Sequence, residues 1–166
     1  MQRDRVEGYI ARGLDEGARL TTGGGRPAGL DRGWFVEPAV LADVDNASVV
    51  AQEETFGPVL TITPYDGEDE AVRLANDSAY GLAGTVWTAD PEHGTSVARR
   101  IRSGTVGMNG YVPDIGSPYG GVKSSGPGRE LARRDSRRTS SRSRSTGRDV
   151  RVVSRGPSPA GRTSPA

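Results

Sequence analysis

The sequence predicts an α/β fold followed by a disordered basic tail, and two observations carry this prediction. Strand-like and helix-like patterns alternate from residue 59 to residue 109, and short connections between such elements are typical of parallel strands in an α/β layer. After residue 131 the chain has no aromatic residue and is rich in arginine and serine. Such a segment buries too little apolar surface to offset its ordering entropy, so we expect disorder there.

Residues 2–17 have the pattern of an amphipathic helix. Val6, Ile10 and Leu14 recur every four residues, and charged residues fill many of the other positions. Gly17 suits the position just after a helix, where a left-handed backbone is common. A short strand is expected next, at residues 19–22.

Residues 34–40 are the most apolar run in the early part of the chain. Pro38 has no amide hydrogen to donate to a neighbouring strand, so we expect an edge strand or an irregular one at this place. Trp34 and Phe35 are expected in the core, because large aromatic side chains contribute much of the area that a core buries.

Helix starts and strands then alternate. Acidic residues from Glu68 onward suit the first turn of a helix, and Asp90 is expected to cap a second helix that has Pro91 at its first position. Val97 and Ile101 are the expected buried stripe of that second helix. Three runs rich in β-branched or apolar residues are the expected strands: 59–65, 83–88 and 105–109.

The 166 residues carry a net charge of only +1, but the charge is divided unevenly. Ten arginines and two acidic residues give residues 131–166 a charge of +8, so residues 1–130 carry −7. The chain has no cysteine, which excludes disulfides and cysteine-ligated metal sites and fits a reducing compartment. It also has no apolar signal segment and no long apolar run, so we expect a cytoplasmic protein with no membrane partner.

The stretch EETFGP, residues 53–58, combines chemistry that few other parts of the chain offer. Two adjacent carboxylates, Glu53 and Glu54, lie close to the aromatic ring of Phe56, and a Gly-Pro pair then ends regular structure. The residues alone leave two interpretations open. One is a solvated loop, which acid pairs before a Gly-Pro turn usually form; the other is a site that grips a ribose and a flat heteroaromatic ring together.

This stretch and two later ones together resemble signatures of the aldehyde dehydrogenase superfamily. The three segments occur in the family's order and at about its spacing. They are QEETFGPV at residues 52–59, GTVGMNGY at 104–111 and SPYGGVKSSGPGRE at 117–130. The resemblance covers residues 1–131 and corresponds to the C-terminal portion of an aldehyde dehydrogenase catalytic domain, with residues 132–166 as a separate tail.

The resemblance implies an oxidoreductase that converts aldehydes to carboxylic acids with NAD or NADP. In this family a cysteine thiolate attacks the aldehyde to form a thiohemiacetal, a hydride passes to the nicotinamide, and water releases the acid. Glu54 matches the family's glutamate that accepts hydrogen bonds from the nicotinamide ribose, and Phe56 matches the aromatic residue beside that ribose. Arg5 falls near the adenosine side, and residues 109–118 are expected to line the aldehyde entrance.

No catalytic residue and no metal ligand is assigned within this chain. The family's nucleophilic cysteine and general-base glutamate match no residue here and are expected upstream of residue 1, so whether the chain is an enzyme stays open. The alternative is a non-catalytic fragment, or a binding protein whose basic tail contacts nucleic acid phosphates; we rank nucleic acid lower, because basic runs often match by composition alone. The family forms homo-oligomers, but the unusual tail argues against one here.

The tail, residues 132–166, begins with a run that a shifted reading frame reproduces. A family-like segment, GPEGLAAYFESKSIYG, can be encoded so that loss of its first base makes the codons read ARRDSRRTSSRSRSTG, which is residues 132–147. We therefore predict a frameshift: one base is missing at this point, in the gene or in its sequence. The family's last helix and strand would then be replaced by a disordered Arg/Ser-rich segment.

Overall fold

The structure, a computed structural model, describes residues 1–30, 32–112, 115–131 and 151–154. It consists of two compact units, Met1–Asp77 and Ser78–Ala166, each with its own three-stranded sheet and its own helices. The α/β class expected from the alternating pattern is therefore confirmed. The division falls within residues 1–131, which the sequence groups together, and most of the basic tail lies outside the described residues.

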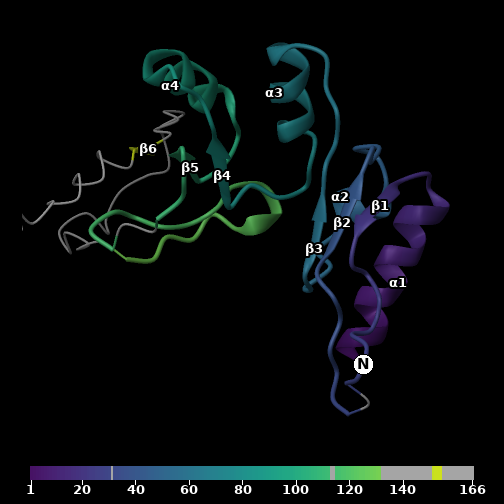
Figure 1. The fold of residues 1–166 in the computed structure, drawn as a ribbon. Coiled ribbons are helices and arrows are strands. Elements are labelled where there is room, and N and C mark those ends of the chain that lie inside the picture. Colours follow the sequence, from purple (N-terminus) through teal and green to yellow (C-terminus); the bar gives the residue numbers. More distant parts are fainter. Residues whose placement is uncertain (31, 113–114, 132–150, 155–166) are drawn as a thin grey trace, which may run out of the picture. The chain divides into compact units, whose positions relative to one another are not determined.

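The first unit has three helices and three strands in its described residues (Figure 1). In chain order they are α1 (Gln2–Asp15), β1 (Arg19–Thr22), β2 (Ala39–Ala42), α2 (Val49–Gln52), β3 (Val59–Thr61) and α3 (Glu68–Asn76). Gly17 has a φ of +97°, so the sharp turn after α1 needs a residue without a β-carbon, as the sequence predicts.

Strand β2 lies in the centre of this sheet, between antiparallel β1 and parallel β3. The edge strand expected at residues 34–40 is therefore wrong in two respects. The strand begins later in the sequence, at Ala39, and it is the central strand of the sheet. The strand begins only after Pro38, because every strand residue from Ala39 onward has an amide hydrogen to donate. The Ala39 amide, for example, donates to the Pro58 carbonyl at 2.8 Å.

The core of the first unit lies between α1 and the sheet. Val6, Ile10 and Ala39 form one buried cluster, and Tyr9 packs with Leu41 in another that also holds Val44 and Val50. Helix and sheet approach closely at Gly13, where a β-carbon would lie 2.9 Å from Leu41 Cδ1. Leu14, expected on the buried stripe, is 40% exposed, because Tyr9 and Gly13 face the sheet in its place.

Trp34 and Phe35 are not core residues, contrary to expectation. Their exposed fractions are 60% and 54%, and the Arg3 guanidinium lies 4.7 Å from the centre of the Trp34 ring. Leu60 and Ile62 are also 59% and 49% exposed. Apolar composition predicts which residues can be buried, but it does not predict which of them other elements of the fold cover.

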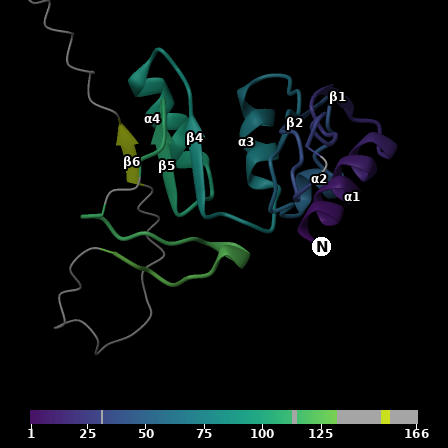
Figure 2. The ribbon, with the colours of Figure 1, turned by 60° about the horizontal axis from the view of Figure 1, so that its bottom comes forward.

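The second unit is built on a strand–helix–strand crossover (Figure 2). Its described elements are β4 (Ala83–Val86), α4 (Pro91–Arg100), β5 (Thr105–Met108), the 3₁₀ turn η1 (Lys123–Ser125) and β6 (Arg151–Ser154). All strand pairs are parallel, in the order β4-β5-β6. The strands expected at residues 83–88 and 105–109 are thus found, slightly shortened, and the strand expected at 59–65 is present as β3.

Helix α4 begins as the sequence predicts. The Asp90 carboxylate accepts hydrogen bonds from the amides of Glu92 and His93, at 2.9 and 3.1 Å, and Pro91 occupies the first helical position. The buried face of α4 is formed by Gly94 and Ala98, while the expected stripe residues Val97 and Ile101 are only half-buried. Small residues face β5 because the helix lies close to it: a β-carbon on Gly94 would be 2.6 Å from Met108 Cε.

Strand β6 departs from the disorder expected for the tail. Residues Arg151–Ser154 pair in register with Thr105–Met108 of β5. Two adjacent valines, Val152 and Val153, give this short segment a high strand propensity, which the arginine-rich composition of the whole tail conceals. Residues 132–150 and 155–166 lie outside the described residues.

Candidate cofactor-binding loop

The candidate site is the loop that joins α2 to β3, residues 53–58. Glu53 ends α2 with an extended backbone, and Phe56 has a φ of +50°, in the left-handed region that a side chain rarely adopts. Gly57 follows, where a β-carbon would lie 2.3 Å from Val6 Cγ2. The loop backbone at Gly57 therefore lies so close to Val6 of α1 that no β-carbon fits between them.

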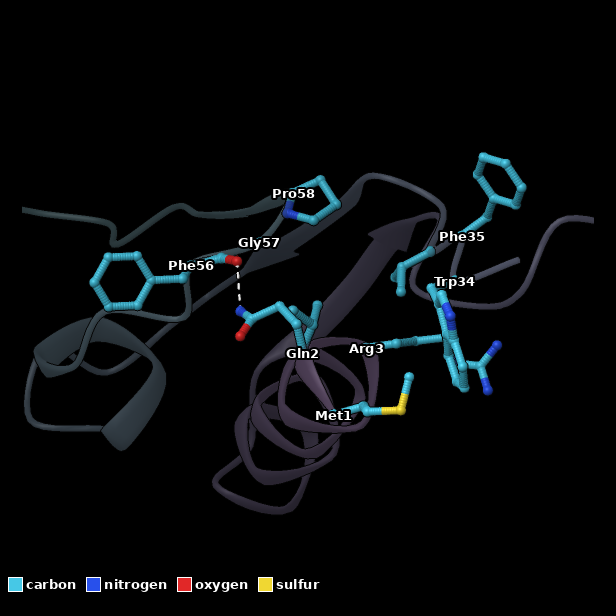
Figure 3. A pocket seen from close by; sticks show the side chains of 10 residues that line it. Met1, Gln2, Arg3, Trp34, Phe35, Phe56, Gly57 and Pro58 are labelled. Atoms are coloured by element: carbon cyan, nitrogen blue, oxygen red, sulfur yellow. Dashed lines mark hydrogen bonds between the residues drawn. The ribbon is translucent and has the colours of Figure 1, made fainter.

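Helix α1 holds the far end of this loop through Gln2. The Gln2 amide Nε2 donates to the carbonyl oxygens of Thr55 and Phe56, at 3.2 and 2.6 Å (Figure 3 shows the bond to Phe56). These bonds satisfy the loop carbonyls and fix the strained backbone at Phe56. Persistent strain of this kind requires such support from surrounding groups.

The near end of the loop is held by Arg5 and Tyr9. Arg5 Nη2 donates to the Glu54 carbonyl oxygen at 2.8 Å and to the Tyr9 hydroxyl at 3.1 Å. The Tyr9 hydroxyl in turn donates to Glu53 Oε2 at 2.6 Å. This bond to the Glu53 carboxylate raises the pKa of Tyr9 above 10.0, and burial of the phenol acts in the same direction.

These contacts leave the predicted binding groups facing solvent. The Glu54 side chain is exposed, and none of the described residues makes a hydrogen bond or ion pair with its carboxylate. Phe56 is 69% exposed. A carboxylate with no partner among the described residues thus lies two residues from an exposed aromatic residue, on a loop whose backbone is held by α1.

Beside the loop is a pocket of about 460 Å³ with mainly apolar walls. Trp34 and Phe35 lie on one side of it and Phe56 on the other, with Gln2 between them and the Phe56 ring turned away from the other two (Figure 3). Aromatic residues of the segment before β2 and of the loop therefore line the same pocket from opposite sides.

Arg5, which the resemblance places near the adenosine side, lies beside the loop. Its guanidinium donates to the Glu54 carbonyl and lies 5.8 Å from the centre of the Phe56 ring. Gln2 and Tyr9 were not singled out from the sequence, and Glu53 was noted only as one of two adjacent carboxylates, with no partner on α1. Their signal was the helical spacing of Gln2, Arg5 and Tyr9, which places these polar groups along one side of α1.

The expected aldehyde entrance, residues 109–118, belongs to the second unit, and Pro113 and Asp114 are not described. Asn109 has a φ of +52°, and its side-chain amide makes two bonds to Thr88 after β4: Oδ1 accepts from the Thr88 amide and Nδ2 donates to the Thr88 carbonyl, both at 2.8 Å. Asn109 thereby ties the segments that follow β4 and β5 together.

The described residues include neither a candidate metal cluster nor a candidate membrane span. No three histidine, cysteine, aspartate or glutamate side chains gather there in a way that could hold a metal ion. None of the helices in that part of the chain has the length and apolar character needed to cross a bilayer.

Relatives of known sequence cover most of this chain. The chain is 63% identical over 129 residues to geranial dehydrogenase of Castellaniella defragrans, and 47% identical over 131 residues to 3-succinoylsemialdehyde-pyridine dehydrogenase of a Pseudomonas species. Each comparison covers 78% of this chain, but only 27% and 28% of the relative. The chain therefore spans little more than a quarter of the length of these proteins.

Solved structures give the same result. An aldehyde dehydrogenase of Mycobacterium tuberculosis, complexed with NAD+, matches with a TM-score of 0.77 and 61% identity over 79% of this chain and 27% of its own. Betaine aldehyde dehydrogenase of Staphylococcus aureus, also with NAD+, matches with a TM-score of 0.76 and 42% identity over 79% and 26%. A sequence model of the aldehyde dehydrogenase family matches residues 1–142. The chain therefore belongs to the aldehyde dehydrogenase family, of which it represents a mixed α/β portion.

Proposed function

We propose that this chain is the part of an NAD(P)-dependent aldehyde dehydrogenase that holds the nicotinamide ribose, with Glu54 and Phe56 as the binding residues. The observation that carries the proposal is the loop itself: a carboxylate without a described partner and an exposed ring on a backbone fixed by α1. The whole protein would oxidise an aldehyde to a carboxylic acid. We expect it to act in the cytoplasm.

The residues present fit a nicotinamide nucleotide. An ionised carboxylate is an acceptor only, and the two hydroxyls of a ribose are donors that it can receive. An exposed aromatic ring offers a flat apolar surface to a sugar or a heterocycle. NAD+ is present in the related structures from M. tuberculosis and S. aureus, which favours NAD over NADP as the cofactor here.

In this proposal the role of the chain is to orient the nicotinamide ribose. A bound nicotinamide nucleotide would supply the hydride acceptor. Glu54 would limit rotation of the ribose, and Phe56 would exclude water from one side of it. Since reacting atoms must be positioned closely, small errors in this orientation are costly in rate. The thiolate of the family has no counterpart among these 166 residues, which contain no cysteine, so it would come from another part of the whole protein.

The test is a chimera in which residues 1–131 replace the matching segment of the geranial dehydrogenase of C. defragrans. The 63% identity makes this exchange feasible, and the recipient supplies the rest of the enzyme. NADH formation with geranial then reports whether the segment completes the active enzyme. In this chimera, Glu54→Gln should slow single-turnover hydride transfer by up to about 10²-fold, with a smaller effect on NAD+ affinity.

The matched control is Glu92→Gln, which removes the charge of an exposed acid in the first turn of α4. It should leave hydride transfer unchanged. A folded chimera with full activity and no loss on Glu54→Gln would remove Glu54 from the site. Failure of Phe56→Ala to change NAD+ binding would do the same for Phe56.

We further propose that the basic tail arose from a frameshift after Leu131. The support is the exact reading of residues 132–147 from a family-like segment in the next frame, together with a sequence match to relatives that covers only 129 to 132 residues. Resequencing the gene across this point tests the idea. A read that retains the present frame with no missing base would exclude it.

A further inference from the structure

We propose that Tyr9 and Glu53 are positioning residues, and that their hydrogen bond, together with Arg5, sets the place of Glu54 and Phe56. The consequence for cofactor orientation rests on the function proposed above. The contact itself does not, because it is a property of the chain alone. We call Gln2, Arg5, Tyr9 and Glu53 the loop clamp.

The clamp follows from the geometry of α1. Gln2, Arg5 and Tyr9 are three and four residues apart and so lie along one side of the helix. They bind the loop in reverse order, Gln2 at its far end and Tyr9 at its start. One helix side thus contacts four consecutive loop residues.

Tyr9 is the firmest part of this clamp. Tyr9 is 8% exposed and packs with Leu41, Val44 and Val50, so packing in the core fixes the position of its hydroxyl. Gln2 is exposed and lies in the first turn of α1, where helices fray. A short O–H···O bond to an ionised carboxylate is also among the stronger hydrogen bonds in proteins.

The Tyr9 hydroxyl makes two bonds at once. It donates to Glu53 and accepts from Arg5, and Arg5 also donates to the Glu54 carbonyl. Glu53 is the residue that ends α2, whose Val50 is packed in the same cluster as the Tyr9 ring. Removing one oxygen atom from Tyr9 therefore releases the end of α2 and one support of Arg5 together.

The first experiment uses the full 166-residue chain labelled with ¹⁵N, and measures backbone order parameters in the loop. With the clamp intact, the amides of Glu54, Thr55 and Phe56 should be rigid, at about 0.85. Tyr9→Phe keeps the ring in the core and should lower them to below about 0.6. Tyr65→Phe, at a tyrosine that is 63% exposed, is the matched control and should change nothing.

A second pair of variants separates the bond from general packing. Glu53→Gln keeps an oxygen that can accept from Tyr9, so it should retain most of the loop order, whereas Glu53→Ala should lose as much as Tyr9→Phe. Combining Tyr9→Phe with Glu53→Ala should add no further loss. Glu53→Ala should also bring the pKa of Tyr9 back toward its ordinary value, followed by NMR of the tyrosine ring. Unchanged order parameters in Tyr9→Phe, or fully additive losses, would overturn the proposal.

The chimera then separates the clamp from the proposed function. If both are correct, Tyr9→Phe slows hydride transfer by about tenfold or more, Glu53→Gln restores it relative to Glu53→Ala, and NAD+ affinity changes little. Lower loop order with unchanged hydride transfer would keep the clamp and count against the role of Glu54. Unchanged loop order would exclude the clamp, whatever Glu54→Gln does.

Discussion

Substitution of Gly57 by alanine tests the close approach of the loop to α1. A β-carbon at this position would lie 2.3 Å from Val6 Cγ2 and 3.0 Å from Val6 Cγ1, well inside normal contact distance. Val6 is only 2% exposed and is enclosed by Ile10 and Ala39, so it has little space to move. The loop or the helix must therefore shift.

Overpacking of this kind costs roughly 1–3 kcal/mol, which lowers the folding equilibrium constant by about 5- to 150-fold. Gly8→Ala is the matched control. Gly8 lies within α1, and a β-carbon there meets no atom within 4 Å. The control should stabilise the chain by about 0.5–1 kcal/mol, because alanine favours the helix over glycine.

The assay is urea unfolding followed by circular dichroism, with the free energy of unfolding obtained by linear extrapolation. Val6→Ala is the second variant, and it is combined with Gly57→Ala in a double-mutant cycle. It loses about 0.8 kcal/mol for each buried carbon removed, but it also opens space for the new methyl group at position 57. The double variant should be more stable than the sum of the single losses predicts, by at least about 0.5 kcal/mol. A neutral Gly57→Ala, or strict additivity, would refute the argument.

Three other outcomes follow from a helix cap, an ion pair and the absence of cysteine. Asp90→Ala should destabilise the second unit by about 0.5–2 kcal/mol in the same assay while Asp90→Asn has little effect, since both Asp and Asn cap helices well; equal losses would contradict the cap. Arg26 donates to the Glu7 carboxylate at 2.8 and 3.0 Å and lowers the pKa of Glu7 below 4.5, so the stability from this pair is present above that pH and lost as pH falls through the folded pKa. Arg26→Gln should raise the pKa of Glu7, measured by NMR titration, and an unchanged value would exclude the pair. The 166-residue chain alone should form no NADH with any aldehyde above a heat-inactivated control, because it has no cysteine.

Local sequence patterns were sufficient to predict much of the fold. The cap at Asp90, the turn at Gly17 and the alternation of strands and helices depend on residues close together in the chain, and all are present in the structure. Trp34 and Phe35 were wrongly expected in the core because burial depends on what covers a side chain. Their exposed fractions, 60% and 54%, depend on how distant segments of the described chain pack, which apolar composition does not encode.

The loop clamp could not be predicted for a different reason. Glu53 and Tyr9 are 44 residues apart in the sequence, and Gln2 and Phe56 are 54 apart. No local pattern encodes such a pairing, even though the polar side of α1 is visible in the sequence. The family resemblance pointed to Glu54 and Phe56 as candidates, but the motif that carries them does not extend to the α1 side chains that contact the loop.

The position of β3 has a consequence for how this chain behaves in solution. Among the described strands of its sheet, β3 pairs with β2 on one side only, so its other edge presents backbone donors and acceptors without strand partners. Leu60, more than half exposed, adds an apolar surface to that edge. Such an edge can pair with the same edge of a second molecule, and natural proteins usually block it with a charged side chain. Any dimer or larger particle formed by this chain alone should therefore be compared with Leu60→Lys before it is attributed to the subunit contacts of the family.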